Sequence, residues 1–241
     1  MAQHLRSFLF LSLATALALE SRISKVYIFE NGPIALNPLF SEARVNTHTA
    51  HPHFLTSFQT MIKSIFRVEL HIKSPFVYMT KGEVANILAK PIVQDLVKAT
   101  SSCWNWFKIP VIAKNLSITW RKESHDGDCL PCILRRTALH RAGLWQNDAQ
   151  YLTDIFAYYS THGKSGDTFK ALAEFLRFCR NVKSLSDVEL LLYAPDFSVY
   201  EEGTDAKELV QMYREHAEEV IRCFRAKSTT QLRQVFASML F

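Results

Sequence analysis

The segment that decides the fold class runs from Lys25 to Pro33 and reads KVYIFENGP. Its first five residues, Lys25–Phe29, are a short β-rich run that predicts a central strand. The remainder, Glu30-Asn31-Gly32-Pro33, is a turn signal. An apolar stretch at residues 3–21 leads directly into the run, as the crossover helix of an α/β fold would. We therefore expect an α/β layer at the start of the chain.

The rest of the chain changes character near residue 147. The patterns predict irregular chain over 33–52, a helix over 54–66, an edge strand over 68–72, and helices from Thr80 to Pro91 and on to Val97. From residue 150 onward the pattern is wholly helical, with a capping box at Ser186 and Glu189. We expect an α/β domain over 1–147 and an all-helical extension over 148–241.

Composition excludes several classes of protein. Of the 241 residues, 48% are hydrophobic and 21% are charged, which is ordinary for a chain with a sizeable core and excludes disordered and collagen-like proteins. No uninterrupted apolar run reaches about 18 residues, so we expect no membrane-spanning helix and no membrane partner.

The N-terminal apolar run has features of a secretory signal peptide. Arg6 precedes the run Phe8–Ala14, and Ala16-Leu17-Ala18 is similar to a cleavage site. However, Cys129 and Cys132 have the C-x-x-C spacing of a zinc site, and thiols that bind zinc need a reducing compartment. The apolar run also leads directly into a strand. We therefore expect a helix of the fold in a cytoplasmic protein, with the signal peptide as the alternative.

Positive charge gathers in the middle of the chain. Residues 60–136 carry 12 basic and 6 acidic side chains, a net charge of 12 − 6 = +6. Such a region suits a polyanion, nucleic acid among them, and an ordinary solvated surface with excess lysine is equally compatible.

The five cysteines do not form a disulfide framework, because their number is odd and their spacing clustered. Cys129 and Cys132 are spaced as a zinc knuckle, and Cys103, in a Ser/Thr loop, is the natural third thiolate. The fourth ligand is His125 or Asp126. The alternative is a coincidental pair of free thiols. The other two cysteines, Cys179 and Cys223, fall on apolar helix faces and are expected to be buried.

Several strings in order give the chain a resemblance. They are Arg6-Ser7, Glu30-Asn31-Gly32 with Leu36-Asn37-Pro38, Thr47-x-Thr49-x-His51-Pro52-His53-Phe54, Thr80-Lys81-Gly82-Glu83, Thr100-Ser101-Ser102-Cys103, Cys129-x-x-Cys132 with Arg135-Arg136, and Trp145 through Phe156. With these strings the chain resembles the C-terminal portion of the 7-cyano-7-deazaguanine synthase family, the QueC-like PP-loop ATP pyrophosphatases, and above all their relatives in Qat-type anti-phage defence systems. The resemblance implies an incomplete sheet of the adenine-nucleotide-hydrolase (PP-loop/HUP) class.

The chain also departs from that family. Asp126 stands where the family's knuckle has its first cysteine, and His48 stands where relatives often carry arginine. The Ser-Gly-Gly-x-Asp-Ser loop that holds the ATP pyrophosphate is missing, since no two of the seven glycines are adjacent. We therefore expect a truncated, split or degenerate homologue that binds ATP and Mg²⁺ only when a partner chain supplies the N-terminal PP-loop half.

The resemblance implies a ligase that uses ATP to activate the carboxylate of 7-carboxy-7-deazaguanine for amidation and nitrile formation. It places a substrate site, for a deazaguanine-type small molecule, at Glu30, Asn31, Thr47, Thr49, His51, Lys81 and Ser102. Glu30 follows a strand at its carboxyl edge, where open α/β sheets bind ligands. Each of these residues is also compatible with a structural role, such as a turn carboxylate, a helix cap or a solvated lysine.

Three functions stay open at this point. The chain is an enzyme fragment that works with an ATP-binding half, an inactive zinc-stapled assembly subunit of a defence complex, or a nucleic-acid-binding protein. The last predicts basic residues interleaved with exposed aromatic ones, and Trp104 and Trp106 are the compact candidates for this.

Overall fold

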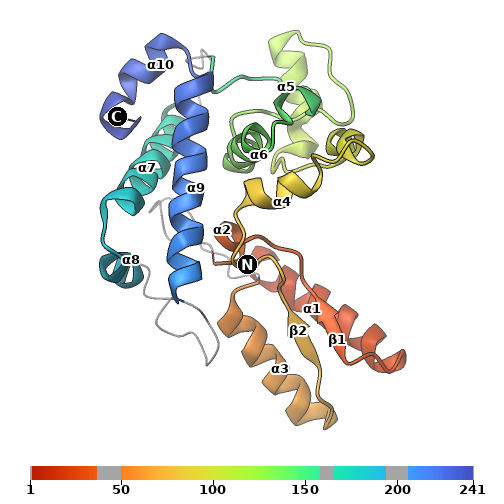
Figure 1. The fold of residues 1–241 in the computed structure, drawn as a ribbon. Coiled ribbons are helices and arrows are strands. Elements are labelled where there is room, and N and C mark those ends of the chain that lie inside the picture. Colours follow the sequence, from red (N-terminus) through yellow and green to blue (C-terminus); the bar gives the residue numbers. More distant parts are fainter. Residues whose placement is uncertain (1, 37–49, 158–164, 194–205, 241) are drawn as a thin grey trace. The chain divides into compact units, whose positions relative to one another are not determined.

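The computed structural model describes residues 2–36, 50–157, 165–193 and 206–240 (Figure 1). This part of the chain is mostly helical and contains two short parallel strands. The chain forms two compact units, one of residues 1–80 and 185–213 and the other of residues 81–184 and 214–241. The boundary expected near residue 147 falls inside the second unit and stays a prediction.

The first unit contains the small α/β layer that the Lys25–Pro33 segment predicted. Its elements are α1 (Ala2–Glu20), β1 (Lys25–Tyr27), α3 (Pro52–Phe66) and β2 (His71–Lys73). The two strands pair in parallel, with Val26 opposite Ile72. The first strand ends two residues before Phe29, although the Ile28 backbone N–H still donates to the Lys73 carbonyl (2.8 Å).

The alternation of side chains explains which face of this sheet is covered. Ile72 is buried and Val26 is half-buried, and both pack with the core that α1 and α3 supply. That core contains Leu11, Leu55, Phe58 and Ile62, so the apolar stripe predicted for 54–66 is confirmed. Residues Lys25 and Tyr27, one step away along the strand, are exposed because they point to the opposite face.

Two short helices complete the described part of the first unit. Helix α2 (Gly32–Ala35) lies where irregular chain was expected, so that expectation is wrong at these residues. A Cβ at Gly32 would collide with the Val77 carbonyl oxygen, which explains the glycine in the turn after β1. Helix α8 (Asp187–Tyr193) has the predicted capping box: Ser186 N–H donates to Glu189 Oε2 (2.8 Å), and Glu189 N–H donates to Ser186 Oγ (3.3 Å).

The second unit is helical in its described residues. Its elements are α4 (Lys81–Ile87), the 3₁₀ turns η1 (Gln94–Ala99), η2 (Trp106–Lys108) and η3 (Trp145–Asn147), and the helices α5 (Ile109–Leu116), α6 (Leu130–Arg141), α7 (Ser165–Ser184), α10 (Thr230–Val235) and α11 (Ala237–Leu240). Helix α9 (Ala206–Lys227) has residues in both units. The second helix expected after Pro91 is instead the 3₁₀ turn η1, so that prediction is wrong.

Helices α7 and α9 bury apolar side chains, among them Leu172, Leu176 and Phe224. Cys179 on α7 and Cys223 on α9 are fully buried, as predicted. Ion pairs border this packing, since Lys183 Nζ lies 2.5 Å from Glu218 Oε2. Among the helices that the structure describes, none is both long and apolar enough to cross a membrane.

Candidate metal centre

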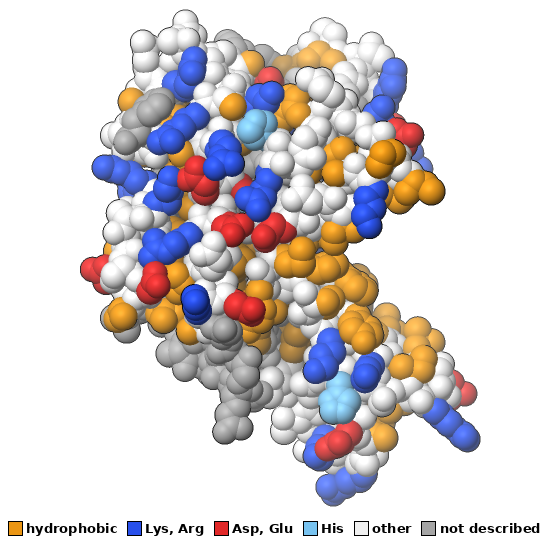
Figure 2. Space-filling view, viewed as in Figure 1, with side chains coloured by type: hydrophobic (Ala, Val, Ile, Leu, Met, Phe, Trp, Pro, Cys, Tyr) orange, Lys and Arg blue, Asp and Glu red, His pale blue; other side chains and the backbone are white. Residues whose placement is uncertain are grey.

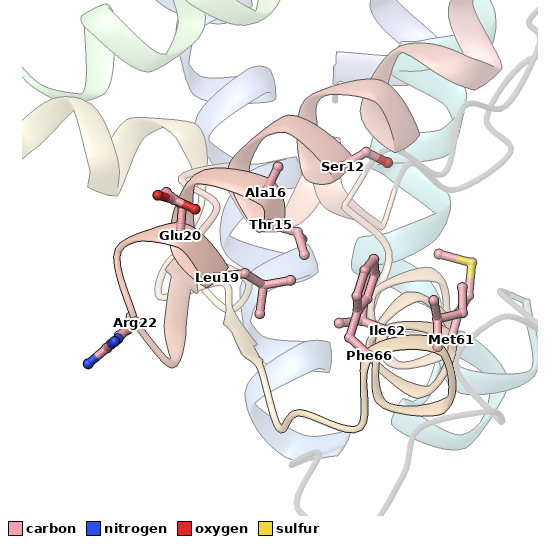
Figure 3. Close-up of a pocket in the computed structure, with 10 residues that line it drawn as sticks. Ser12, Thr15, Ala16, Leu19, Glu20, Arg22, Met61, Ile62 and Phe66 are labelled. Carbon is pink, nitrogen blue, oxygen red and sulfur yellow. The ribbon is translucent and has the colours of Figure 1, made fainter.

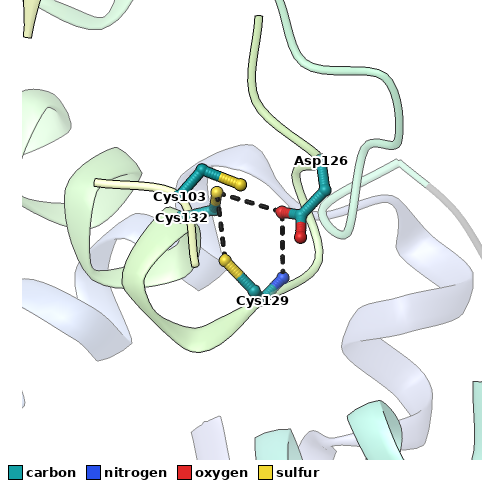
Figure 4. A group of neighbouring side chains, drawn as sticks. All are labelled: Cys103, Asp126, Cys129 and Cys132. Carbon is teal, nitrogen blue, oxygen red and sulfur yellow. Dashed lines mark hydrogen bonds between the residues drawn. The ribbon is translucent and has the colours of Figure 1, made fainter. Parts of the chain in front are cut away.

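Four side chains from two separate stretches of the second unit converge on one point. They are Cys103, Asp126, Cys129 and Cys132, and their ligand atoms all lie within 4.8 Å of one another (Figure 4). The Cys129 and Cys132 sulfurs are 3.3 Å apart, and Cys132 Sγ lies 3.1 Å from Asp126 Oδ1. The predicted knuckle and its third thiol are therefore brought together, and the structure places Asp126, not His125, in the group.

The two knuckle cysteines are held by the start of α6. Cys129 is the N-cap residue of this helix and Pro131 lies in its first turn, where a missing N–H costs nothing. The Cys129 backbone N–H donates to Asp126 Oδ1 (3.4 Å). Helix α6 begins at Leu130, so the knuckle forms its first turn.

Asp126 is fixed by a short parallel bridge between residues 125 and 151. Its carbonyl oxygen accepts the Thr153 backbone N–H (2.9 Å), and its Oδ2 accepts a hydrogen bond from Asn105 Nδ2. The next residue, Gly127, has φ +96°, and a Cβ there would collide with the Thr153 carbonyl oxygen. Only glycine therefore fits between the carboxylate and the knuckle.

The third thiol comes from a loop that is anchored by its own helix. Cys103 packs with Ile109 and Ala113 of α5 and with Cys132 and Leu152 in one buried cluster. An apolar shell of this kind limits solvent access to the four donor atoms, which strengthens electrostatic interactions among them.

The three thiols cannot all ionise without a cation. Hydrogen bonds from Cys129 and Cys132 lower the pKa of Cys103. The same contacts with Cys103 raise the pKa of Cys129 and of Cys132, and burial raises them further. A divalent cation at this point would reverse that balance, because coordination deprotonates thiols outright.

The donor set fits a soft or borderline tetrahedral metal ion. In a tetrahedral zinc site with bonds of about 2.3 Å, neighbouring sulfurs lie about 3.8 Å apart, close to the spacing in this cluster. Asn105 orients the carboxylate through its outer oxygen, as partners of metal ligands usually do. The cluster can therefore bind a metal, and zinc is compatible with it.

His125, the other candidate for the fourth ligand, has a different role. It is fully buried, its ring lies 5.3 Å from the Tyr151 ring, and its Nε2 accepts the Ser102 backbone N–H at 3.5 Å. Burial lowers its pKa, and the positive charge of Arg135 lowers it further. The neutral imidazole thus supports the loop that carries Cys103.

The two arginines that follow the knuckle are buried. From the sequence alone, they could contact phosphate, pair with Asp126 and Asp128, or form a solvated basic face. Arg135 instead pairs with Asp148 at 2.8 Å and donates to the Val97 carbonyl and to Thr100 Oγ1. Arg136 pairs with Asp154. The solvated basic face is therefore wrong.

Aromatic rings enclose the second of these arginines. Its guanidinium carbon lies 4.6 Å from the ring centroids of Trp145, Tyr151 and Phe156. Both arginines therefore tie α6 to the segment that follows it. The supporting residues Asn105, Asp148 and Tyr151 were missed from the sequence, since no spacing rule connects them to the knuckle.

The substrate-site residues implied by the resemblance lie in both units. In the first unit Glu30 follows β1, Asn31 is the N-cap residue of α2, and His51 is the N-cap residue of α3, where its Nδ1 accepts the His53 N–H. In the second unit Lys81 begins α4 and Ser102 precedes the metal cluster. The predicted Thr47 and Thr49 lie outside the described residues. Their grouping as one site stays a prediction.

A separate cavity of about 730 Å³ lies between α1 and α3 in the first unit. Leu19 and Phe66 point toward the space between the two helices, and Arg22 points away from it (Figure 3). Thr15 is buried there, and its hydroxyl has no hydrogen-bond partner in the described part of the chain. Of the predicted substrate-site residues that the structure describes, none lines this cavity.

No family model, curated protein or solved structure matches the chain.

Proposed function

We propose that Cys103, Asp126, Cys129 and Cys132 bind one structural Zn²⁺ ion. The observation that carries the proposal is the meeting of four buried or half-buried donors from two stretches of chain within 4.8 Å. Four protein ligands leave no open position for water or substrate, which is the arrangement of a structural site. Zinc there would join the Cys103 loop, the Asp126 bridge and α6 into one rigid body.

The test is elemental analysis of purified protein combined with a ligand variant. We expect about one zinc per chain, and Cys129→Ser should lower zinc content and melting temperature together because metal binding is coupled to folding. Cys179→Ser is the matched control, because that thiol is buried away from the cluster. Much less than one zinc per chain with all five thiols titratable would contradict the proposal.

We further propose that the zinc-stapled chain is a QueC-like subunit that works with an ATP-binding chain. The resemblance supports this, and so does the possible metal-binding group that includes the two knuckle cysteines. A second support is the α/β layer, whose sheet has only two strands in the described residues. Exposed apolar side chains surround this layer, among them Phe29 (67% exposed) and Leu17 (70%), and Figure 2 shows hydrophobic side chains gathered over α1 and β1.

In this proposal the partner holds ATP and this chain contributes substrate contacts. Glu30 and Asn31, just beyond the carboxyl end of β1, would meet the polar edge of a deazaguanine. The sequence has no adjacent glycines to form a phosphate-binding loop, so we expect the chain by itself to show no measurable ATP binding.

Two measurements test this proposal. Calorimetry of the chain with ATP and Mg²⁺ should show no heat of binding, and micromolar affinity would contradict the division of labour. Co-expression with a chain that carries Ser-Gly-Gly-x-Asp-Ser should give a complex that releases AMP and pyrophosphate when ATP, Mg²⁺, 7-carboxy-7-deazaguanine and ammonia are added. A chain that gains neither solubility nor activity from such a partner would favour the inactive assembly subunit.

A further inference from the structure

Exposed aromatic and basic side chains alternate along one continuous segment next to the metal cluster. We call residues 104–122 the aromatic–basic segment. Its exposed aromatic residues are Trp104 (54%), Trp106 (69%), Phe107 (58%) and Trp120 (41%), and its exposed basic residues are Lys108, Lys114, Arg121 and Lys122. It contains no acidic residue and holds three of the four tryptophans of the chain.

We propose that the aromatic–basic segment binds single-stranded nucleic acid. Proteins that bind single strands combine cations that follow the phosphates with rings on which the bases stack. Here both groups occur side by side, since Lys108 Nζ lies 5.4 Å from the centre of the Phe107 ring. A duplex would satisfy the cations alone, because its bases are stacked on one another and cannot reach the rings.

The base of the segment is rigid, as a binding platform requires. Ile109 and Ala113 of α5 are buried against Cys103 and Cys132, so the metal cluster lies directly beneath the segment. The exposed rings therefore project from an anchored backbone, which reduces the conformational entropy lost when a strand binds.

The same geometry disfavours a membrane surface as the partner. Tryptophan and lysine also occur at lipid interfaces, but there the apolar stripe of an amphipathic helix enters the bilayer. Most of the large apolar residues of α5, namely Ile109 with the half-buried Ile112 and Leu116, are turned into the core of this unit, as is Ala113. Val111 is exposed (60%), but it is flanked on its face of the helix by lysines and does not form a stripe. The exposed rings come mostly from the turns and loops on either side of α5.

The experiment measures binding of the full chain to labelled 20-nucleotide dT and rU strands by fluorescence anisotropy, with quenching of tryptophan emission as a second readout. We expect binding to at least one of the two strands, and the two arms distinguish DNA from RNA. Trp106→Ala and Trp120→Ala should each weaken binding by about 5- to 150-fold, the range measured for loss of one stacked base. Lys108→Gln and Lys114→Gln should each reduce the slope of log K against log salt by about 0.7.

Matched variants in the first unit provide the controls. Phe10→Ala removes an equally exposed ring, and Lys73→Gln removes an exposed lysine of β2, so neither should change binding. The proposal is overturned if neither strand binds at low salt, if a duplex binds as tightly as a single strand, or if the tryptophan variants bind as well as the native chain. Binding to anionic vesicles that the same tryptophan variants abolish, without strand binding, would assign the segment to membranes instead.

Discussion

The metal-cluster region and the α1–β1 layer differ in whether their side chains find partners within the chain. In the second unit, Arg135 and Asp148 are both about 94% buried and paired with each other. In the first unit, Lys63 and Glu69 form an ion pair that is about two-thirds exposed, while large apolar side chains of α1 also face outward. The metal-cluster region pairs its buried charges internally, whereas the α1–β1 layer leaves apolar area unburied.

This difference separates what holds the chain together from what is left for a partner. Buried charges are tolerated only when they are paired and hydrogen-bonded, so the metal-cluster region is a structural unit that any single loss would disrupt. Exposed apolar area of this extent is typical of an interface. We therefore expect changes in the metal-cluster region to destabilise the chain more than changes on the outward face of the α1–β1 layer.

Metal removal should have the largest effect, and it should be confined to one region. Structural zinc contributes about 10–16 kcal/mol in zinc-finger peptides, so a chelator should abolish hydrogen-exchange protection in α5 and α6. Helices α1 and α3 should keep their protection because none of the four ligands lies in the first unit. Hydrogen exchange followed by mass spectrometry measures both regions together. Equal loss of protection in both units would show that the two units fold as one. No loss of protection would show that a metal ion does not stabilise α5 and α6.

The buried arginine should have the next largest effect. Arg135→Met leaves Asp148 buried and without its cation, at a cost of about 3–5 kcal/mol in the free energy of unfolding. The double variant Arg135→Met with Asp148→Leu should recover part of this loss, since no lone charge remains. Lys63→Met removes half of the exposed pair and should leave the denaturation midpoint unchanged. Equal effects of Arg135→Met and Lys63→Met in urea denaturation would show that the buried ion pair contributes no more to stability than the exposed one.

The sequence predicted those features that depend on nearby residues. The helices at 3–21 and 54–66, the capping box at Ser186 and the C-x-x-C knuckle each follow from residues within one or two turns of one another. Cys103 could be added because it was the one remaining cysteine in a polar loop.

What the sequence could not reveal depends on contacts between distant residues. Asp126 was preferred over His125 only once the bridge to Tyr151 and Thr153 fixed its carboxylate. The pairing of Arg135 with Asp148 joins residues that share no helix face or strand register. The turn over Gln94–Ala99 was read as a helix because a 3₁₀ segment has the same local composition.

A buried histidine should make stability depend on pH by an intermediate amount. Burial, together with a smaller effect of the charge of Lys81, lowers the pKa of His216 from 6.5 to about 4. Because the unfolded state then binds the extra proton first, its contribution is complete above about pH 6.5 and is lost as pH falls toward 4. The full difference is about 3 kcal/mol.

Comparison of the native chain with His216→Phe isolates the contribution of His216 to the pH dependence of stability, because protonation of the metal-binding thiols affects both proteins alike. Urea unfolding at pH 7, 5.5 and 4.5 should show a smaller decline for the variant. Parallel curves would indicate that His216 is protonated in the folded chain, and hence that its surroundings are more open than the structure shows.

The smallest effect on stability should come from the outward face of α1. Leu17 is 70% exposed, so Leu17→Gln should change the free energy of unfolding by less than about 0.5 kcal/mol. Leu11, on the same helix, is buried in the core of the layer, and Leu11→Ala should cost about 2–5 kcal/mol. The same Leu17→Gln change should weaken capture of a co-expressed ATP-binding chain, because burial of that side chain would favour the complex. If Leu17→Gln instead destabilises the chain as much as Leu11→Ala does, the outward face of α1 is already packed in the folded protein. The α1–β1 layer would then be as closed as the metal-cluster region, and no partner would be needed to cover it.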